Sequence, residues 1–188
     1  CGSIARSVED AAAMVDVMSA AVSGERLADA ARAEPGRLRI RLVLRPAHGT
    51  VDPEVEGATC AVARTLEALG HDVEEGPGPD VALDHVLPLW QGLIATAPVW
   101  REKLQPITRW LIDEARRSNA AERRLLHDRV TGAALAGFGD VDLCLTPTVP
   151  VLPPRIGAFA GRPASEAFRE AAVLAAFTAT YNVTGQPA

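Results

Sequence analysis

The sequence predicts an α/β fold, in which helices flank a mixed β-sheet. Apolar residues recur at every second position in residues 38–44 and 141–145, the period that marks strands. Residues 52–70 lie between these stretches and carry apolar residues at helical spacing. The chain has 188 residues, of which 48% are hydrophobic, and this is enough for a sizeable core.

Composition excludes several functional classes. The net charge of −5 supplies no basic field for nucleic acid, so no nucleic-acid partner is expected. No apolar run approaches the roughly 18 residues of a membrane-spanning helix, so no membrane partner is expected. The three cysteines are an odd number without metal-type spacing, which indicates a reducing compartment and therefore a cytoplasmic location.

The first 36 residues predict a capped helix followed by a loop. Ser7 is a good N-cap, and the acidic residues Glu9 and Asp10 follow in the first turn, where the helix dipole favours negative charge. An apolar face follows, and Gly24 is the expected stop. Residues 25–36 are polar and Ala-rich, which predicts a loop with a short helical turn.

Residues 38–74 predict a βαβ unit with a right-handed crossover. After the first strand, Asp52 is the expected N-cap and Pro53 the first helical residue. The apolar positions of this helix are Val55, Ala58, Val62, Leu66 and Leu69. Gly70 closes the helix, and residues 71–74 form a second strand. No Gly-rich phosphate loop lies between strand and helix, so nucleotide binding is disfavoured.

Residues 82–136 are expected to be mostly helical, with interruptions at Pro88, Pro98 and Pro106. Asn119 is the expected N-cap of a helix that runs to about residue 135. The three tryptophans are ten residues apart and share no helical face, which favours separate packing or cleft-wall roles. The pairs 116–117 and 123–124 are arginines, interpreted as a solvated surface.

The stretch 140–154 carries the candidate site. A strand at 141–145 is stopped by a proline-rich run, because each proline removes a backbone donor and fixes φ. Thr146, Pro147 and Thr148 therefore lie at the carboxyl end of a core strand, where open α/β sheets place ligand clefts. We interpret them as substrate-binding residues; a stiff exit loop without ligands is the alternative. Ser165 is the expected cap of a final helix.

Four separated stretches resemble the amidase signature family, in the family's order. They are Ala-Arg-Ser-Val-Glu-Asp-Ala-Ala at 5–12, the Val-Asp-Pro-Glu-Val helix at 51–71, Asp-Leu-Cys-Leu-Thr-Pro-Thr at 142–148, and residues 177–188. The resemblance implies a small-molecule amide substrate and hydrolysis of a carboxamide C–N bond to a carboxylate and ammonia or an amine. It also implies a Ser–Ser–Lys triad, in which a buried lysine of lowered pKa acts as the base.

No catalytic residue can be assigned in this chain. It has no Gly-Gly-Ser-rich loop, its six serines lie at caps, helices and loops, and Lys103 matches no family motif. Neither a metal-ligand cluster nor a dinucleotide fingerprint is present, so no cofactor is implied. We therefore expect residues 1–188 to be the C-terminal part of a single amidase domain, truncated at both ends, with the catalytic residues outside it.

Two other interpretations stay open. The chain could be a non-catalytic homologue that binds or assembles, such as a degenerate amidase or an amidotransferase subunit. It could also be a thiol enzyme that pairs Cys144 with His48, His71, His85 or His127. In a fragment the edges of the sheet should lack partners, with strands 38–44 and 141–145 the most affected, and an unpaired edge invites association. The isolated chain is then expected to be marginally stable or self-associating, with a homodimer possible.

Overall fold

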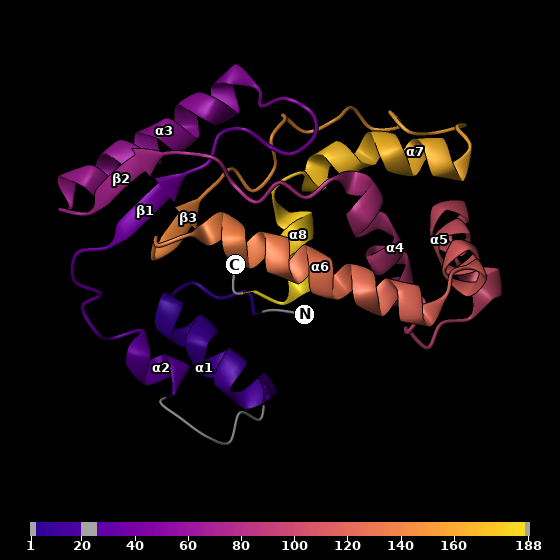
Figure 1. Cartoon of the computed structure of the whole chain (residues 1–188), viewed down its shortest axis with the longest axis horizontal. Coiled ribbons are helices and arrows are strands. Elements are labelled where there is room, and N and C mark those ends of the chain that lie inside the picture. The colour runs from indigo at the N-terminus through magenta and orange to yellow at the C-terminus, as the bar shows by residue number, and fades with distance from the viewer. Residues whose placement is uncertain (1–2, 20–25, 187–188) are drawn as a thin grey trace. The chain divides into compact units, whose positions relative to one another are not determined.

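The computed structural model describes residues 3–19 and 26–186 (Figure 1). The chain divides into two compact units, Cys1–Arg37 and Leu38–Ala188. In the described ranges, no helix combines the length and the apolar character that a bilayer crossing requires.

The first unit contains helices α1 (Val8–Ser19) and α2 (Leu27–Ala30). The predicted cap is confirmed, since Ser7 Oγ accepts a hydrogen bond from the Asp10 amide at 3.1 Å. Asp16 on α1 then caps α2, because its carboxylate accepts from the amides of Leu27 at 2.9 Å and Ala28 at 3.1 Å. None of the residues of α1 is buried. Gly24, the expected stop, lies outside the described residues.

The second unit is built on a sheet of three parallel strands, β1 (Arg39–Leu42), β2 (Asp72–Glu75) and β3 (Leu143–Leu145), in the order β2-β1-β3. Helices flank this sheet (Figure 1), so the predicted α/β class is confirmed. The expected mixed pairing is not found among the described strands, because both later strands join β1 in parallel. The expectation of an unpaired edge is wrong for residues 38–44, because β1 pairs on both sides, whereas β3 in residues 141–145 pairs only with β1 among the described strands. Strands β2 and β3 pair with opposite edges of β1, which makes β1 the central strand.

Helix α3 (Pro53–Ala68) connects β1 to β2 and begins as predicted, with the Asp52 carboxylate accepting from the Glu54 amide at 2.8 Å. Its predicted inner face is partly wrong, because Val62 and Leu69 are 49% and 70% exposed. The buried residues are Thr59 and Ala63. A sheet this small offers a narrow contact, and small side chains let the helix lie close to it. Ala63 packs there with Leu42 and Leu44.

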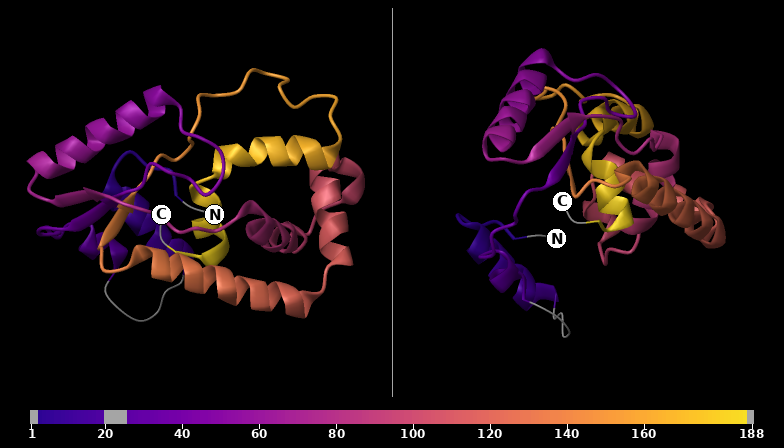
Figure 2. Two further views of the ribbon diagram at one scale, coloured as in Figure 1. Left: turned by 45° about the horizontal axis from the view of Figure 1, so that its top comes forward. Right: turned by 60° about the vertical axis from the view of Figure 1, so that its left-hand side comes forward.

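The remaining helices pack around α4 (Leu83–Ile94), which contacts α5 (Pro106–Arg117), α6 (Ala120–Phe138) and α8 (Thr178–Thr184) (Figure 2). Two 3-10 turns, η1 (Arg101–Lys103) and η2 (Ala172–Ala175), and helix α7 (Ala164–Ala171) complete this layer. Its core contains Val81, Val86, Leu89 and Val130. The predicted cap of α6 is confirmed, because Asn119 Oδ1 accepts from the Ala121 amide at 2.8 Å.

Three local predictions in this layer are wrong. Pro88 lies inside α4 rather than interrupting it, because its neighbours Leu87 and Leu89 are buried and their packing outweighs one lost backbone hydrogen bond. Ser165 is inside α7, whose N-cap is Pro163. Arg123 is not part of a solvated surface. Its guanidinium donates to the carbonyls of Ala115 at 3.1 Å and Ser118 at 3.0 Å, and so satisfies the end of α5.

The separate roles expected for the tryptophans are confirmed. Trp110 packs against Phe168 with ring centroids 5.7 Å apart. Trp100 is 73% exposed, and Lys103 Nζ lies 4.6 Å from the centre of its ring. Trp90 lines a cavity between helices.

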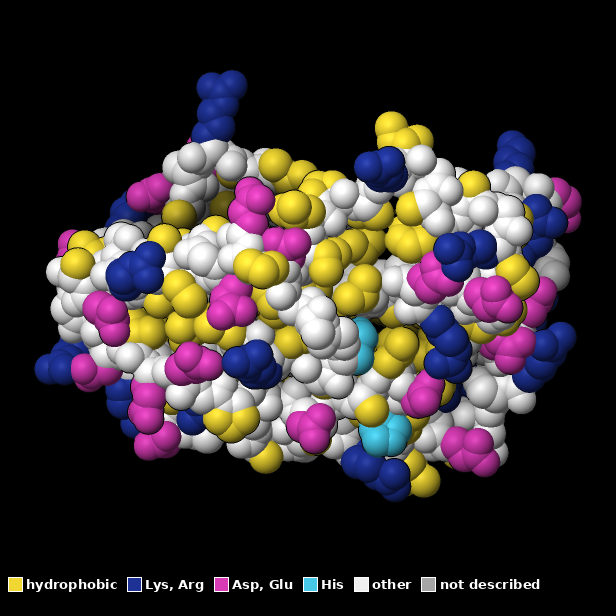
Figure 3. All heavy atoms as spheres, turned by 90° about the horizontal axis from the view of Figure 1, so that it is seen from above, with side chains coloured by type: hydrophobic (Ala, Val, Ile, Leu, Met, Phe, Trp, Pro, Cys, Tyr) yellow, Lys and Arg dark blue, Asp and Glu magenta, His cyan; other side chains and the backbone are white. Residues whose placement is uncertain are grey.

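The segment after β3 exposes apolar side chains, namely those of Val149, Leu152 and Ile156. Figure 3 shows hydrophobic side chains in the middle of the face seen from above, with charged side chains around them.

Two glycines of α6 should respond oppositely to alanine. A Cβ at Gly137 would lie 2.8 Å from the Pro79 Cα, whereas a Cβ at Gly132 would meet no atom within 4 Å. Gly132→Ala should stabilise the chain by up to about 1 kcal/mol, through helix propensity alone. Gly137→Ala should destabilise it by about 1–2 kcal/mol, because overpacking against backbone exceeds that gain. Urea unfolding of both variants measures the difference, and equal effects would contradict the close approach of Pro79.

Candidate substrate-binding site

The carboxyl ends of β1 and β3 mark the point where the strand order reverses. From β1 the chain passes through α3 to β2 on one side, and β3 later pairs on the other side. Open α/β sheets bind ligands outside the carboxyl ends of their strands at such a switch point. Thr146 directly follows β3 at this place.

A cavity of about 720 Å³ lies beside β3. Its walls combine apolar side chains with hydroxyl and amide groups, namely those of Phe138, Asp142, Leu143, Cys144, Leu145, Thr146, Thr148, Thr178, Tyr181, Asn182 and Gln186. Five of these residues, 142–146, are consecutive. Successive side chains of a strand point to opposite faces, so a cavity that touches all five runs along the edge of β3 rather than over one face.

The predicted residues take different positions at this cavity. Thr146 and Thr148 both line it, and Pro147 is buried between them and is not part of its lining. The Thr146 hydroxyl donates to the Pro147 carbonyl at 2.9 Å, which leaves its oxygen lone pairs available. Thr148 is exposed. That these residues bind substrate stays a prediction.

Helix α8 supplies the wall that the sequence did not reveal. Thr178, Tyr181 and Asn182 lie three and four positions apart, which places them on one face of the helix. The Tyr181 ring meets Phe138 edge-on, with centroids 6.2 Å apart. This spacing was visible in the sequence. It acquires meaning only because α8 packs beside α6, whose last residue is Phe138.

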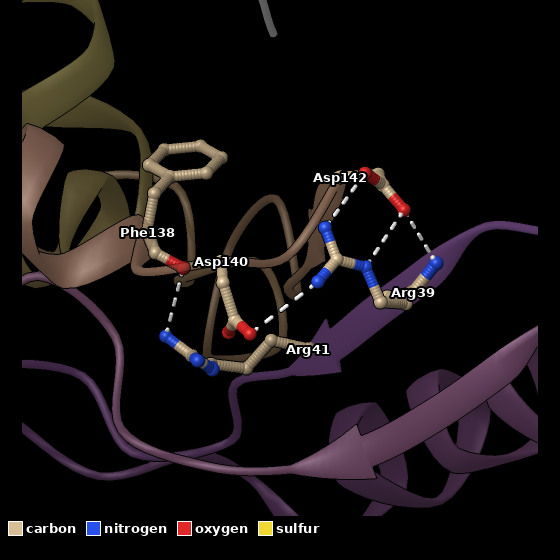
Figure 4. A network of polar contacts seen from close by, with 5 residues as sticks. All are labelled: Arg39, Arg41, Phe138, Asp140 and Asp142. Carbon is tan, nitrogen blue, oxygen red and sulfur yellow. Dashed lines mark hydrogen bonds and ion pairs between the residues drawn. The ribbon is translucent and has the colours of Figure 1, made fainter.

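Two arginines of β1 form hydrogen bonds with the end of α6 and with the segment that leads from α6 to β3, beside this cavity (Figure 4). The Asp142 carboxylate accepts from the Arg39 backbone amide at 2.8 Å and from its guanidinium at 3.3 and 3.4 Å. These bonds, the backbone one first, lower the pKa of Asp142, and the same carboxylate raises the pKa of Arg39. The Arg39 guanidinium also donates to Asp140 at 3.3 Å.

Arg41 anchors the end of α6. Its guanidinium donates to the carbonyls of Gly137 at 2.7 Å and Phe138 at 3.1 Å. A cation at this position satisfies carbonyls that no helical amide can reach and complements the helix dipole. Because Phe138 lines the cavity, the same contact fixes one of its walls.

Two ionisable groups of the cavity lining have raised pKa values. Burial raises the pKa of the Cys144 thiol, although Arg41 opposes this, and burial also raises the pKa of Tyr181. The lining contains no histidine, so the geometry that a thiol enzyme needs at Cys144 is not formed by the described residues. Within residues 3–19 and 26–186, no group of three or more His, Cys, Asp or Glu side chains could hold a metal ion.

The structure is an α/β fold with a cavity at the edge of a parallel sheet. The family model described as Amidase matches residues 1–188, and the chain therefore belongs to the amidase family. The predicted resemblance is confirmed. AmiC of Mycobacterium leprae is 34% identical over 173 residues, covering 82% of this chain and 37% of that protein. The 6-aminohexanoate-cyclic-dimer hydrolase of Paenarthrobacter ureafaciens is 30% identical over 226 residues, covering 100% of this chain and 45% of that protein.

Solved structures agree in fold. The structure of 6-aminohexanoate cyclic dimer hydrolase superposes with a TM-score of 0.70 at 22% identity, over 96% of this chain and 45% of that chain. A bacterial aryl acylamidase of the amidase signature family gives a TM-score of 0.64 at 19% identity, over 96% and 43%. The chain thus spans less than half the length of the relatives that it matches.

The Arg39–Asp142 pair should make stability depend on pH. A carboxyl whose folded pKa is lowered adds stability above its unfolded pKa of about 4, and this is lost as pH falls through the folded pKa. Asp142→Asn should therefore lower Tm slightly at pH 7, and the difference in Tm from the parent chain should narrow as pH falls below about 4 and vanish below the folded pKa. Glu67→Gln, an exposed change on α3, is the control. A gap that persists in acid would contradict the ionic contribution.

Proposed function

We propose that this chain is part of an amidase that hydrolyses carboxamide C–N bonds to a carboxylate and ammonia or an amine. The observation that carries this proposal is the 720 Å³ cavity at the edge of β3, in a chain that belongs to the amidase family. In this proposal residues 1–188 are the C-terminal part of one amidase domain, and they supply a wall of its substrate cleft.

The lining supports a neutral amide as ligand. Thr146, Thr148 and Tyr181 offer hydroxyls that can donate to a carbonyl or accept from an N–H, and Asn182 and Gln186 offer amides. The single carboxylate of the lining, Asp142, is already paired with Arg39. An uncharged carboxamide matches such donors and acceptors without leaving a buried charge unpaired.

Bond cleavage is assigned to a Ser–Ser–Lys triad outside this chain, as the family resemblance implies. A serine oxygen attacks the carbonyl carbon, the amine leaves with a proton relayed from lysine through the second serine, and water then hydrolyses the acyl-enzyme. The substrate is a small molecule and the location is the cytoplasm. Sequence read upstream of Cys1 should contain a lysine and a Gly-Gly-Ser-rich loop. Their absence would favour the non-catalytic homologue instead.

The 188-residue chain alone should not hydrolyse simple aliphatic or aromatic amides above background, because residues 3–19 and 26–186 hold no activated nucleophile. Ammonia release from acetamide and benzamide measures this, with the longer protein as the positive control. The Cys144→Ala variant tests the thiol directly. Turnover that survives this substitution would reveal a serine or lysine site within the chain.

In the longer protein, Thr148→Val should raise KM for a carboxamide about 5- to 10-fold, because one hydrogen bond to the ligand is worth about 1 kcal/mol. Thr65→Val is the matched control, since Thr65 is exposed on α3 and its hydroxyl bonds only the Ala61 carbonyl at 3.1 Å. An unchanged KM for both variants would show that Thr148 does not bind the substrate. It would favour the alternative, in which residues 146–148 form a stiff exit loop without ligands.

A further inference from the structure

A second cavity, of about 170 Å³, lies between α4 and the segment formed by α7, η2 and α8. We call it the apolar chamber. Its lining is apolar except for one side chain, and consists of Leu83, Val86, Leu87, Trp90, Phe168, Ala171, Ala172, Ala175, Ala179 and Asn182.

The two sides of the apolar chamber differ in side-chain size. Helix α4 contributes Leu83, Val86, Leu87 and Trp90, whereas the opposite side contributes four alanines, whose short side chains do not reach across. Phe168 closes one side, and its ring is held in place by Trp110 of α5, with centroids 5.7 Å apart. The aromatic and branched side chains are packed against their neighbours, so they do not move into the space and fill it.

The volume and the walls define a ligand class. The apolar chamber is partly open to solvent, and its volume of about 170 Å³ is close to that of the roughly 150 Å³ apolar cavities that take up benzene, so it has room for one six-membered ring. A charged group would lose part of its hydration there without gaining a partner, because the lining carries no charge. The fitting ligand is therefore an uncharged ring or a branched hydrocarbon of similar size.

Asn182 joins this chamber to the cavity beside β3. This exposed residue of α8 is in the lining of both spaces, so the two lie next to each other at one residue. A molecule with a ring in the chamber would place a directly attached polar group beside Asn182. The Asn182 amide can donate to a carbonyl and accept from an N–H, as a carboxamide requires.

We propose that the apolar chamber binds the ring of the substrate, and that the substrates are amides in which a benzene-sized apolar group is attached to the carboxamide. The statement that the ring carries a carboxamide rests on the proposed function. Binding of an apolar ring in the chamber is a property of this chain alone, and it can be measured without any turnover.

The first experiment titrates the chain with benzene in a sealed cell and follows Tm. At about ten times its Kd, benzene should raise Tm by about 3–6 °C. Ala175→Leu, which fills the chamber, should abolish the shift, and Ala61→Leu on the exposed surface of α3 should retain it. No shift in the parent chain, or an equal shift in both variants, would overturn the chamber as a binding site.

Should Ala175→Leu fail to fold, the opposite change keeps the question answerable. Leu83→Ala enlarges the chamber from the α4 side. It should admit naphthalene, seen as a Tm shift of the same size that the parent chain lacks. A parent chain and a Leu83→Ala variant that respond alike to naphthalene would contradict the location of the site.

The second experiment separates the chamber from the amide assignment. Benzamide should displace benzene, and Asn182→Ala should weaken benzamide about 5- to 10-fold while leaving benzene unchanged. Benzene binding with no response to benzamide would overturn the substrate class and keep the chamber. Failure of the proposed function would appear elsewhere, as absence of amide hydrolysis by the longer protein, and would leave the benzene titration untouched.

Discussion

The contact between Arg41 and the end of α6 is the constraint on which the rest of the second unit depends. A strand only four residues long, β1, has to hold neighbours on both edges and a layer on each face. Its apolar residues Ile40 and Leu42 are buried, and Leu42 packs with Ala63 of α3, whereas Arg41 reaches the carbonyls of Gly137 and Phe138. The chain makes room for this side chain with glycine. A Cβ at Gly76 would lie 3.3 Å from the Arg41 side chain, and one at Gly139, where φ is +59°, would lie 3.4 Å from it.

The same constraint positions the site. Once α6 is fixed at its end, only a short connection leads to β3, and Arg39 holds that connection through Asp140 and Asp142 (Figure 4). Exposed ion pairs add little to stability on their own. Here the backbone amide of Arg39 also donates to Asp142, so the pair sets where β3 begins as well as neutralising charge. The wall from 142 to 148 is therefore placed by β1, a strand about a hundred residues earlier in the sequence.

Sequence predicted what is local in this structure. The Asp52–Pro53 start of α3, the Asn119 cap of α6 and the end of β3 before Thr146 each follow from interactions within a few residues. Longer-range features escaped. The central place of β1 depends on which side each later strand joins, and no periodicity encodes that choice. Pro88 stays inside α4 because the burial of its neighbours outweighs a local preference, and the buried positions of α3 depend on the narrow contact that the small sheet offers. The α8 wall needed the knowledge that Tyr181 meets Phe138.

In the proposed function, ligand recognition and bond cleavage lie in different parts of the protein. The cavity wall of this chain carries hydroxyls, amides and an apolar chamber beside it, but no activated nucleophile. Cys144 illustrates the separation, since burial raises its thiol pKa and thereby suppresses the thiolate in a cavity that has no imidazole among its lining residues. In the proposed site, recognition depends on residues such as Asn182, which borders the β3 cavity and the apolar chamber. Substitutions among the alanines opposite α4 would reshape the chamber without touching β1 or its two arginines. Ligand preference in this fold can therefore change while the support of the site stays constant.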